Sequence, residues 1–69
     1  MPKPRYQPIE VERHGGRRVA VIFDRVARKQ VKVHKRGQSF FRWDAHDLRV
    51  ENAALRRVAR EALEGVGAS

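Results

Sequence analysis

Cationic side chains and aromatic rings are interleaved in one segment near the middle of the chain. Residues 28–44 read Arg-Lys-Gln-Val-Lys-Val-His-Lys-Arg-Gly-Gln-Ser-Phe-Phe-Arg-Trp-Asp. Lys and Arg neutralise phosphate oxygens, Arg also binds the edge of guanine, and an exposed aromatic ring stacks on a base. These residue types predict binding to nucleic acid, with DNA preferred over RNA.

The predicted contact residues divide by role. Most are cations for phosphate, two arginines also suit a guanine edge, and one phenylalanine is the candidate for base stacking. The predicted nucleic-acid-binding residues are Arg18, Arg28, Lys29, Lys32, His34, Lys35, Arg36, Phe40 and Arg42.

The same segment predicts a β-hairpin, because Val31 and Val33 alternate with polar residues and aromatic residues follow Gly37. A type I turn at residues 34–37, with Gly37 left-handed, pairs Val31 with Phe41. One face is then core. The other is cationic, because opposed residues on antiparallel strands share a face. This face collects Gln30, Lys32, His34, Phe40 and Arg42.

A second register of this hairpin is also open. A two-residue loop of Arg36 and Gly37 sets Val33 against Phe40 and Val31 against Arg42. This register mixes polar and apolar side chains on both faces, so we prefer the first. A basic surface with an aromatic neighbour is expected in either case.

An earlier hairpin is predicted around Gly15 and Gly16. A three-residue loop with Gly16 left-handed sets Val11 against Val19. Residues 19–23 are apolar on both faces, which is typical of an inner strand, and Asp24 is a suitable start for the connecting turn.

The chain then changes from strand to helical periodicity. A stripe at 3.6-residue spacing predicts a helix that packs on the apolar face of the sheet. Asn52 suits the N-cap and Gly65 the terminator, but the start lies anywhere between Ala45 and Asn52, since residues 44–47 also suit an earlier cap. The stripe is Leu55, Val58, Ala59, Ala62, Leu63 and Val66.

These elements predict an α+β fold, in which a small antiparallel β-sheet of three to four strands, built from two hairpins, packs against one C-terminal α-helix. The domain spans residues 9–66, after an extended basic, Pro-rich arm at residues 1–8 and before a tail at 67–69. From residue 17 to 66, the order of a basic sheet and then a helix resembles small DNA-binding domains of the integrase arm-binding or AP2 type. That resemblance is architectural, transfers no residue role, and implies a sheet laid in the major groove.

Charge along the chain is one-sided. Residues 1–36 hold 11 Lys and Arg against three acids, and residues 37–69 hold five of each, so the whole net charge of +8 lies in the first half. A polyanionic partner follows, namely nucleic acid. The alternative is a small protein-binding regulator or inhibitor, of the kind encoded by phages and mobile elements, that docks on an acidic protein surface.

Several function classes are not expected. The 69 residues contain no Cys, no phosphate-binding or nucleophile motif and no clustered histidines, so we expect neither an enzyme nor a metal or cofactor site. The apolar run at residues 19–23 is too short to cross a membrane. We therefore expect a cytoplasmic protein with no membrane partner, either a monomer or a homodimer, since so short a chain has a small core.

Overall fold

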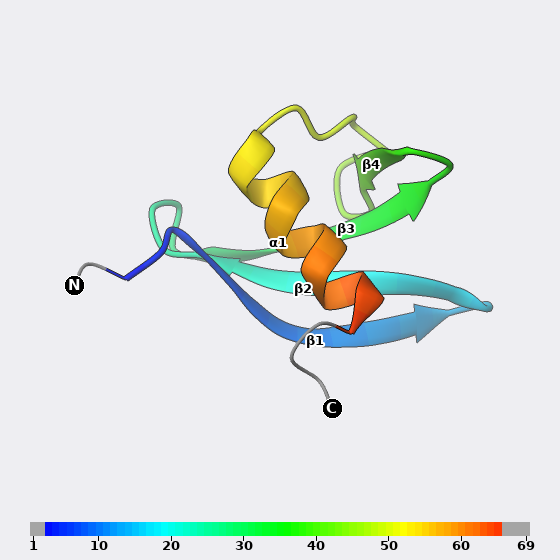
Figure 1. Ribbon diagram of the computed structural model, residues 1–69, viewed down its shortest axis with the longest axis horizontal. Coiled ribbons are helices and arrows are strands. Elements are labelled where there is room, and N and C mark those ends of the chain that lie inside the picture. Colours follow the sequence, from blue (N-terminus) through cyan, green and yellow to red (C-terminus); the bar gives the residue numbers. More distant parts are fainter. Residues whose placement is uncertain (1–2, 66–69) are drawn as a thin grey trace.

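Four strands and one helix make up the computed structural model, which describes residues 3–65. The elements are β1 (Tyr6–His14), β2 (Arg17–Asp24), β3 (Lys29–Arg36), β4 (Ser39–Arg42) and α1 (Ala53–Glu64). The strands form one antiparallel sheet in the order β1-β2-β3-β4, with α1 across one face (Figure 1). The predicted α+β fold of two hairpins and a C-terminal helix is confirmed. The predicted tail and Val66 lie outside the described residues.

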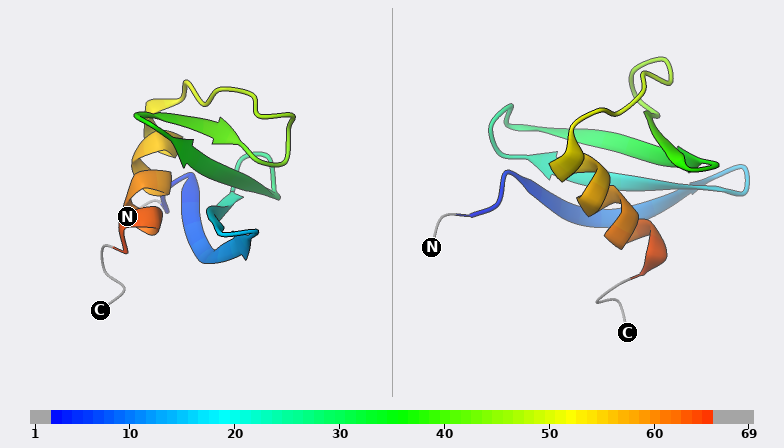
Figure 2. Two further views of the ribbon diagram at one scale, coloured as in Figure 1. Left: turned by 90° about the vertical axis from the view of Figure 1, so that its right-hand side faces the viewer. Right: turned by 45° about the horizontal axis from the view of Figure 1, so that its top comes forward.

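The sheet has two different faces. Figure 2 shows α1 on one side of the sheet and no helix on the other. We call these the helix face and the open face. Side chains of Ala20, Ile22, Val31 and Val33 point to the helix face and are at most 3% exposed. Val19 and Val21 alternate with them and are equally buried on the open face. The prediction that residues 19–23 form an inner strand is confirmed, since they belong to β2, which lies between β1 and β3.

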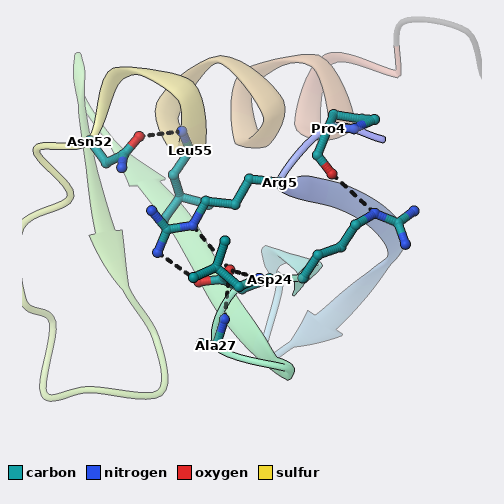
Figure 3. A network of polar contacts seen from close by, with 8 residues as sticks. Pro4, Arg5, Asp24, Ala27, Asn52 and Leu55 are labelled. Atoms are coloured by element: carbon teal, nitrogen blue, oxygen red, sulfur yellow. Dashed lines mark hydrogen bonds and ion pairs between the residues drawn. The ribbon is translucent and has the colours of Figure 1, made fainter. Parts of the chain in front are cut away.

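Residues 6–8 belong to the first strand, so the predicted arm boundary at residue 9 is wrong. β1 begins at Tyr6, whose side chain is 6% exposed in the core. Arg5 donates to both carboxylate oxygens of Asp24, from Nε at 3.1 Å and Nη2 at 3.2 Å (Figure 3). Arg25 Nε donates to the carbonyl of Pro4 at 3.0 Å (Figure 3). These bonds fasten the N-terminal segment to the loop between β2 and β3.

Asp24 also organises that loop, as the sequence predicts. Its Oδ1 accepts from the N–H groups of Val26 at 3.0 Å and Ala27 at 3.2 Å. Its carbonyl accepts from the N–H of Arg28 at 2.7 Å. An aspartate that bonds its own following backbone is a common turn starter, and here the same carboxylate holds Arg5.

The first hairpin closes with two residues and not three. His14 pairs with Arg17 across Gly15 and Gly16, whose φ angles are +58° and +86°. Two successive left-handed residues make a type I′ turn, whose twist matches that of the strands and which Gly-Gly adopts readily. Val11 therefore pairs with Ala20, and the predicted pairing with Val19 is wrong.

The second hairpin also has a two-residue turn. Arg36 pairs with Ser39 across Gly37 and Gln38, and Gly37 alone has a positive φ, +61°. This is the pattern of a type II′ turn, which takes Gly at its first central position. Both registers predicted from the sequence are therefore wrong.

The observed register exchanges the faces of the β4 side chains. Phe40 pairs with Lys35, lies on the helix face and is 1% exposed, and Arg42 lies on that face too. Phe41 pairs with His34 on the open face. The prediction that Phe40 and Arg42 share a cationic face with His34 is thus wrong, because the two-residue turn shifts the pairing by an odd number of residues.

α1 packs its apolar stripe on the sheet, as predicted. Oδ1 of Asn52 accepts from the N–H of Leu55 at 3.1 Å, and Gly65 is the left-handed C-cap, so both predicted caps are confirmed and the helix begins at Ala53. No helix within residues 3–65 has the length and apolar content to cross a membrane. The core contains Tyr6, Ala20, Ile22, Val31, Val33, Phe40, Val50, Leu55, Ala59 and Leu63.

The two hairpins separate toward their turns. β1 and β2 pair along their whole length, from Tyr6 with Asp24 to His14 with Arg17. β2 and β3 pair only from Asp24 with Lys29 as far as Ala20 with Val33. The turns of the two hairpins therefore lie apart at the right of Figure 1.

Phe40 is a test of the observed register. Phe40→Ala empties a buried site and should lower the free energy of unfolding by about 3–5 kcal/mol, a large part of the total stability of a small domain. Leu48→Ala, at a side chain that is 62% exposed, should change it by less than about 0.5 kcal/mol. Urea denaturation measures both. Equal stability of Phe40→Ala and the wild type would contradict the burial of Phe40.

Arg5 gives a test by pH. The Arg5 guanidinium holds the pKa of the Asp24 carboxyl below its usual range, so this pair stabilises the fold at neutral pH and ceases to do so as the pH falls through that lowered pKa. Arg5→Gln should therefore unfold more easily at neutral pH and start acid unfolding at a higher pH.

Circular dichroism during acid titration measures this difference. Arg57→Gln, on the exposed side of α1, removes the same charge and should titrate like the wild type. Coincident acid transitions for Arg5→Gln and Arg57→Gln would show that the Asp24 pair does not govern acid stability.

Candidate functional site

A cationic cleft lies between the turn of the first hairpin, the end of β3 and the C-terminal half of α1. Its volume is about 560 Å³. Arg17 and Arg18 line it from the start of β2, Lys35 from the end of β3, and Arg60 from α1. We call these four residues the cleft cations. The exposed backbone of the Gly15-Gly16 turn also lines the cleft, so no side chain obstructs that side.

The local structure explains why four cations meet here. Arg17 and Arg18 follow the tight turn, and consecutive strand residues point to opposite faces. Because β2 is not paired to β3 beyond Ala20, both arginines border the gap. Lys35 reaches it from the helix face, and Arg60 lies one turn before the end of α1. Residues as far apart in the chain as Arg17 and Arg60 thus meet in one site because α1 crosses over the sheet.

The cleft cations carry an unbalanced charge. Among the described residues, none of the four forms an ion pair with a carboxylate, although Glu64 lies in the lining. Some cations elsewhere are matched by carboxylates. Arg5 pairs with Asp24 at 3.1 Å and Arg42 with Asp44 at 2.8 Å. Four cations against one carboxylate, Glu64, leave this concave surface with an excess of positive charge, which attracts anions. The cleft is therefore suited to an anion.

A buried histidine links the cleft to the open face. His34 is 1% exposed, and both of its ring nitrogens are bonded. Nη1 of Arg17 lies 3.1 Å from Nδ1 of His34, and Nε2 lies 2.8 Å from Oδ1 of Asp47. A guanidinium only donates, so Nδ1 accepts and Nε2 carries the proton that it donates to Asp47. This chain of bonds fixes the position of Arg17 at the mouth of the cleft.

Asp47 belongs to a loop with an uncommon backbone. His46 and Asp47 have φ angles of +53° and +56°. This is a left-handed backbone conformation that residues other than glycine adopt rarely. The hydrogen bond from His34 holds the pKa of the Asp47 carboxyl below its usual range, and Arg36, at 3.5 Å, acts in the same direction. These attractions help to keep the loop in its strained form.

The open face is covered by side chains and not by a second helix. Trp43 stacks on His14 with ring centroids 5.2 Å apart and meets His34 edge-on at 5.4 Å. Lys32 from β3 pairs with Glu12 from β1 at 3.1 Å, and so bridges the intervening β2. These contacts explain why valines of β2 are buried on this face.

The structure brings only part of the predicted contact set together. Arg18 and Lys35 lie in the cleft, whereas Arg36 does not line it and contacts Asp47. Arg28 and Lys29 lie at the loop between β2 and β3, which is the opposite end of the sheet from the cleft (Figure 1). The predicted residues therefore form no single face.

Four predicted contact residues are engaged within the fold. Phe40 and His34 are each 1% exposed, so the predicted stacking role of the Phe40 ring is wrong. Lys32 is paired with Glu12, and Arg42 with Asp44. Burial and internal pairing leave the second hairpin with less free charge than its sequence suggests.

Two cleft cations were absent from the prediction. Arg17 is adjacent to Arg18 and directly follows the Gly-Gly turn, so its position beside a tight turn was a usable indication. Arg60 is 42 residues further along the chain than Arg18. Only the direction in which α1 crosses the sheet brings Arg60 to the cleft, and helical periodicity does not state that direction.

Comparison with known proteins adds no functional assignment. A scan against protein-family models, a search of the curated proteins and a search of the solved structures each gave no match. Within residues 3–65, no group of three or more His, Asp or Glu side chains is placed to hold a metal ion. Any proposal for function therefore rests on the cleft and its surroundings.

Asp47 gives a test of the histidine bonds. Asp47→Ala removes the acceptor from the buried Nε2–H of His34 and takes away a residue type that tolerates a left-handed backbone, so it should unfold at lower urea concentration. Asp47→Asn keeps an acceptor oxygen and that tolerance, and should be close to the wild type. Urea denaturation followed by circular dichroism compares them. Equal midpoints for the Ala and Asn variants would contradict a structural role for this bond.

Proposed function

We propose that this protein binds nucleic acid by holding phosphate groups in the cationic cleft. The observation that carries the proposal is the convergence of Arg17, Arg18, Lys35 and Arg60 on one concave site, with no carboxylate partner for any of them within residues 3–65. A row of phosphates is the commonest polyanion that such a site meets. The proposal places the protein in the cytoplasm.

The charge of the rest of the molecule supports this choice. The chain carries a net charge of +8, which accelerates the approach of a polyanion over distances of about a Debye length. Cations outside the cleft, such as Arg28 and Lys29 at the other end of the sheet, are exposed. They favour any anionic surface, whereas the cleft cations are placed to fix the position of a strand.

The open sheet face is a poorer candidate than the cleft. A sheet laid in the major groove, as the architectural resemblance implies, would present the open face to DNA. In this fold, Glu10 and Glu12 of β1 point to that face, and Trp43 and Asp47 cover part of it. Carboxylates on that surface repel phosphate. We therefore assign binding to the cleft at the ends of the strands.

Charge reversal in the cleft tests the proposal. Arg18→Glu with Lys35→Glu should abolish binding of a labelled oligonucleotide while the circular dichroism spectrum stays unchanged. Arg28→Glu with Arg49→Glu makes the same change of charge at exposed positions away from the cleft, and should weaken binding far less. Fluorescence anisotropy measures both. Equal losses in the two double variants would show that binding depends on net charge and not on the cleft.

Salt dependence gives the number of phosphates that are neutralised. Four contacts predict a slope of about −3 for the logarithm of the binding constant against the logarithm of salt concentration, at about 0.7 per contact with a single strand. The cleft double variant should have a shallower slope. No binding of DNA or RNA at low salt would overturn the proposal and favour an acidic protein surface as the partner.

A further inference from the structure

The single tryptophan of the chain lies at the surface beside the cleft. Trp43 follows β4 directly and is 38% exposed. Its indole stacks on the imidazole of His14, with ring centroids 5.2 Å apart and an interplanar angle of 24°. His34 packs edge-on against the indole at 5.4 Å and is itself fixed by two hydrogen bonds. The ring of Trp43 is thus held in one orientation while more than a third of the residue faces solvent.

His14 connects this aromatic pair to the cleft. It ends β1, lines the cleft together with Arg17 and Arg18, and stacks on Trp43. One imidazole ring therefore separates the cleft cations from the indole. Because His14 lines the cleft and stacks on Trp43, the aromatic pair adjoins the site that would hold a phosphate.

The space next to the indole is large enough for a base. A shallow pocket of about 350 Å³ is lined by Trp43, Asp44, His46 and Asp47. Its two carboxylates are already matched, because Asp44 accepts two hydrogen bonds from Arg42 and Asp47 lies against His34 and Arg36. Their remaining lone pairs are acceptors for the amino groups of bases. The pocket therefore combines an aromatic surface with acceptors whose charge is compensated.

We propose that Trp43 and His14 form a stacking platform for an unpaired base of the strand whose phosphates occupy the cationic cleft. This inference rests on the proposed function and makes it more specific, because it assigns the partner as single-stranded nucleic acid or an unpaired segment of a folded RNA. In a duplex, both faces of each base are covered by its neighbours, so a side chain stacks only on bases that have been splayed out.

The test compares two single strands with the same phosphates. One is an oligonucleotide of about 12 nucleotides, within the range of site sizes for single-strand binders, and the other is its abasic counterpart. The wild type should bind the strand with bases about 5- to 150-fold more tightly than the abasic strand. Fluorescence of Trp43, the only tryptophan, should be quenched by the strand with bases and unchanged by the abasic strand. These two measurements need no variant.

Variants locate the preference for bases. Trp43→Ala should bring the ratio of the two affinities close to one and leave the affinity for the abasic strand unchanged. Leu48→Ala, an exposed apolar residue of the same loop, should keep the wild-type ratio. The cleft double variant Arg18→Glu with Lys35→Glu should lose both strands.

The outcomes separate the two proposals. Equal affinity of the wild type for the strands with and without bases, with no quenching, would overturn the stacking platform and leave phosphate binding intact. Failure of both strands to bind would overturn the proposed function itself. Tighter binding to a duplex of the same length than to the single strand would also overturn the platform, because the bases of a duplex are not free to stack on Trp43.

Discussion

The conformation of the turn at Gly37 and Gln38 determines on which face of the sheet each β4 side chain lies. A type II′ turn pairs Arg36 with Ser39. Because side chains alternate along a strand, this pairing fixes the face of every β4 residue. Phe40 enters the core with Val33, and His34 lies opposite Phe41 on the other face. A register shifted by one residue would bury Phe41 in place of Phe40. The burial of Phe40 and the position of Phe41 opposite His34 therefore depend on this turn.

The two faces of the sheet are covered in different ways. α1 covers the helix face, and the open face is covered by a tryptophan, a histidine and an ion pair between Glu12 and Lys32. Polar side chains can cover that face because each buried polar atom has a hydrogen-bond partner. Among the described residues, no buried side-chain nitrogen or oxygen lacks a partner. His34 illustrates this, since a buried imidazole with one free nitrogen would lower the stability of the fold.

The distribution of ion pairs separates structural from available charge. Arg5, Lys32 and Arg42 are cations that the fold uses, each held by a carboxylate. The cleft cations lie where the hairpins separate, and the ladder between β2 and β3 has ended there. At the same end of the sheet, His14 lies between the cleft and Trp43. In our proposals, the phosphate site and the base site therefore lie at one end of the sheet.

The sequence by itself determined the element order, the helix and its caps, and the one-sided charge. These properties are local or compositional: Asn52 and Gly65 act on their own turns, and the apolar stripe of α1 repeats within a few residues. Tertiary structure decided the registers, because Gly-Gly and Gly-Gln permit turns of different length, and a difference of one residue reverses every face. It also decided which cations are free, since pairing of Lys32 with Glu12 and the approach of Arg60 to Arg18 join residues far apart in the chain.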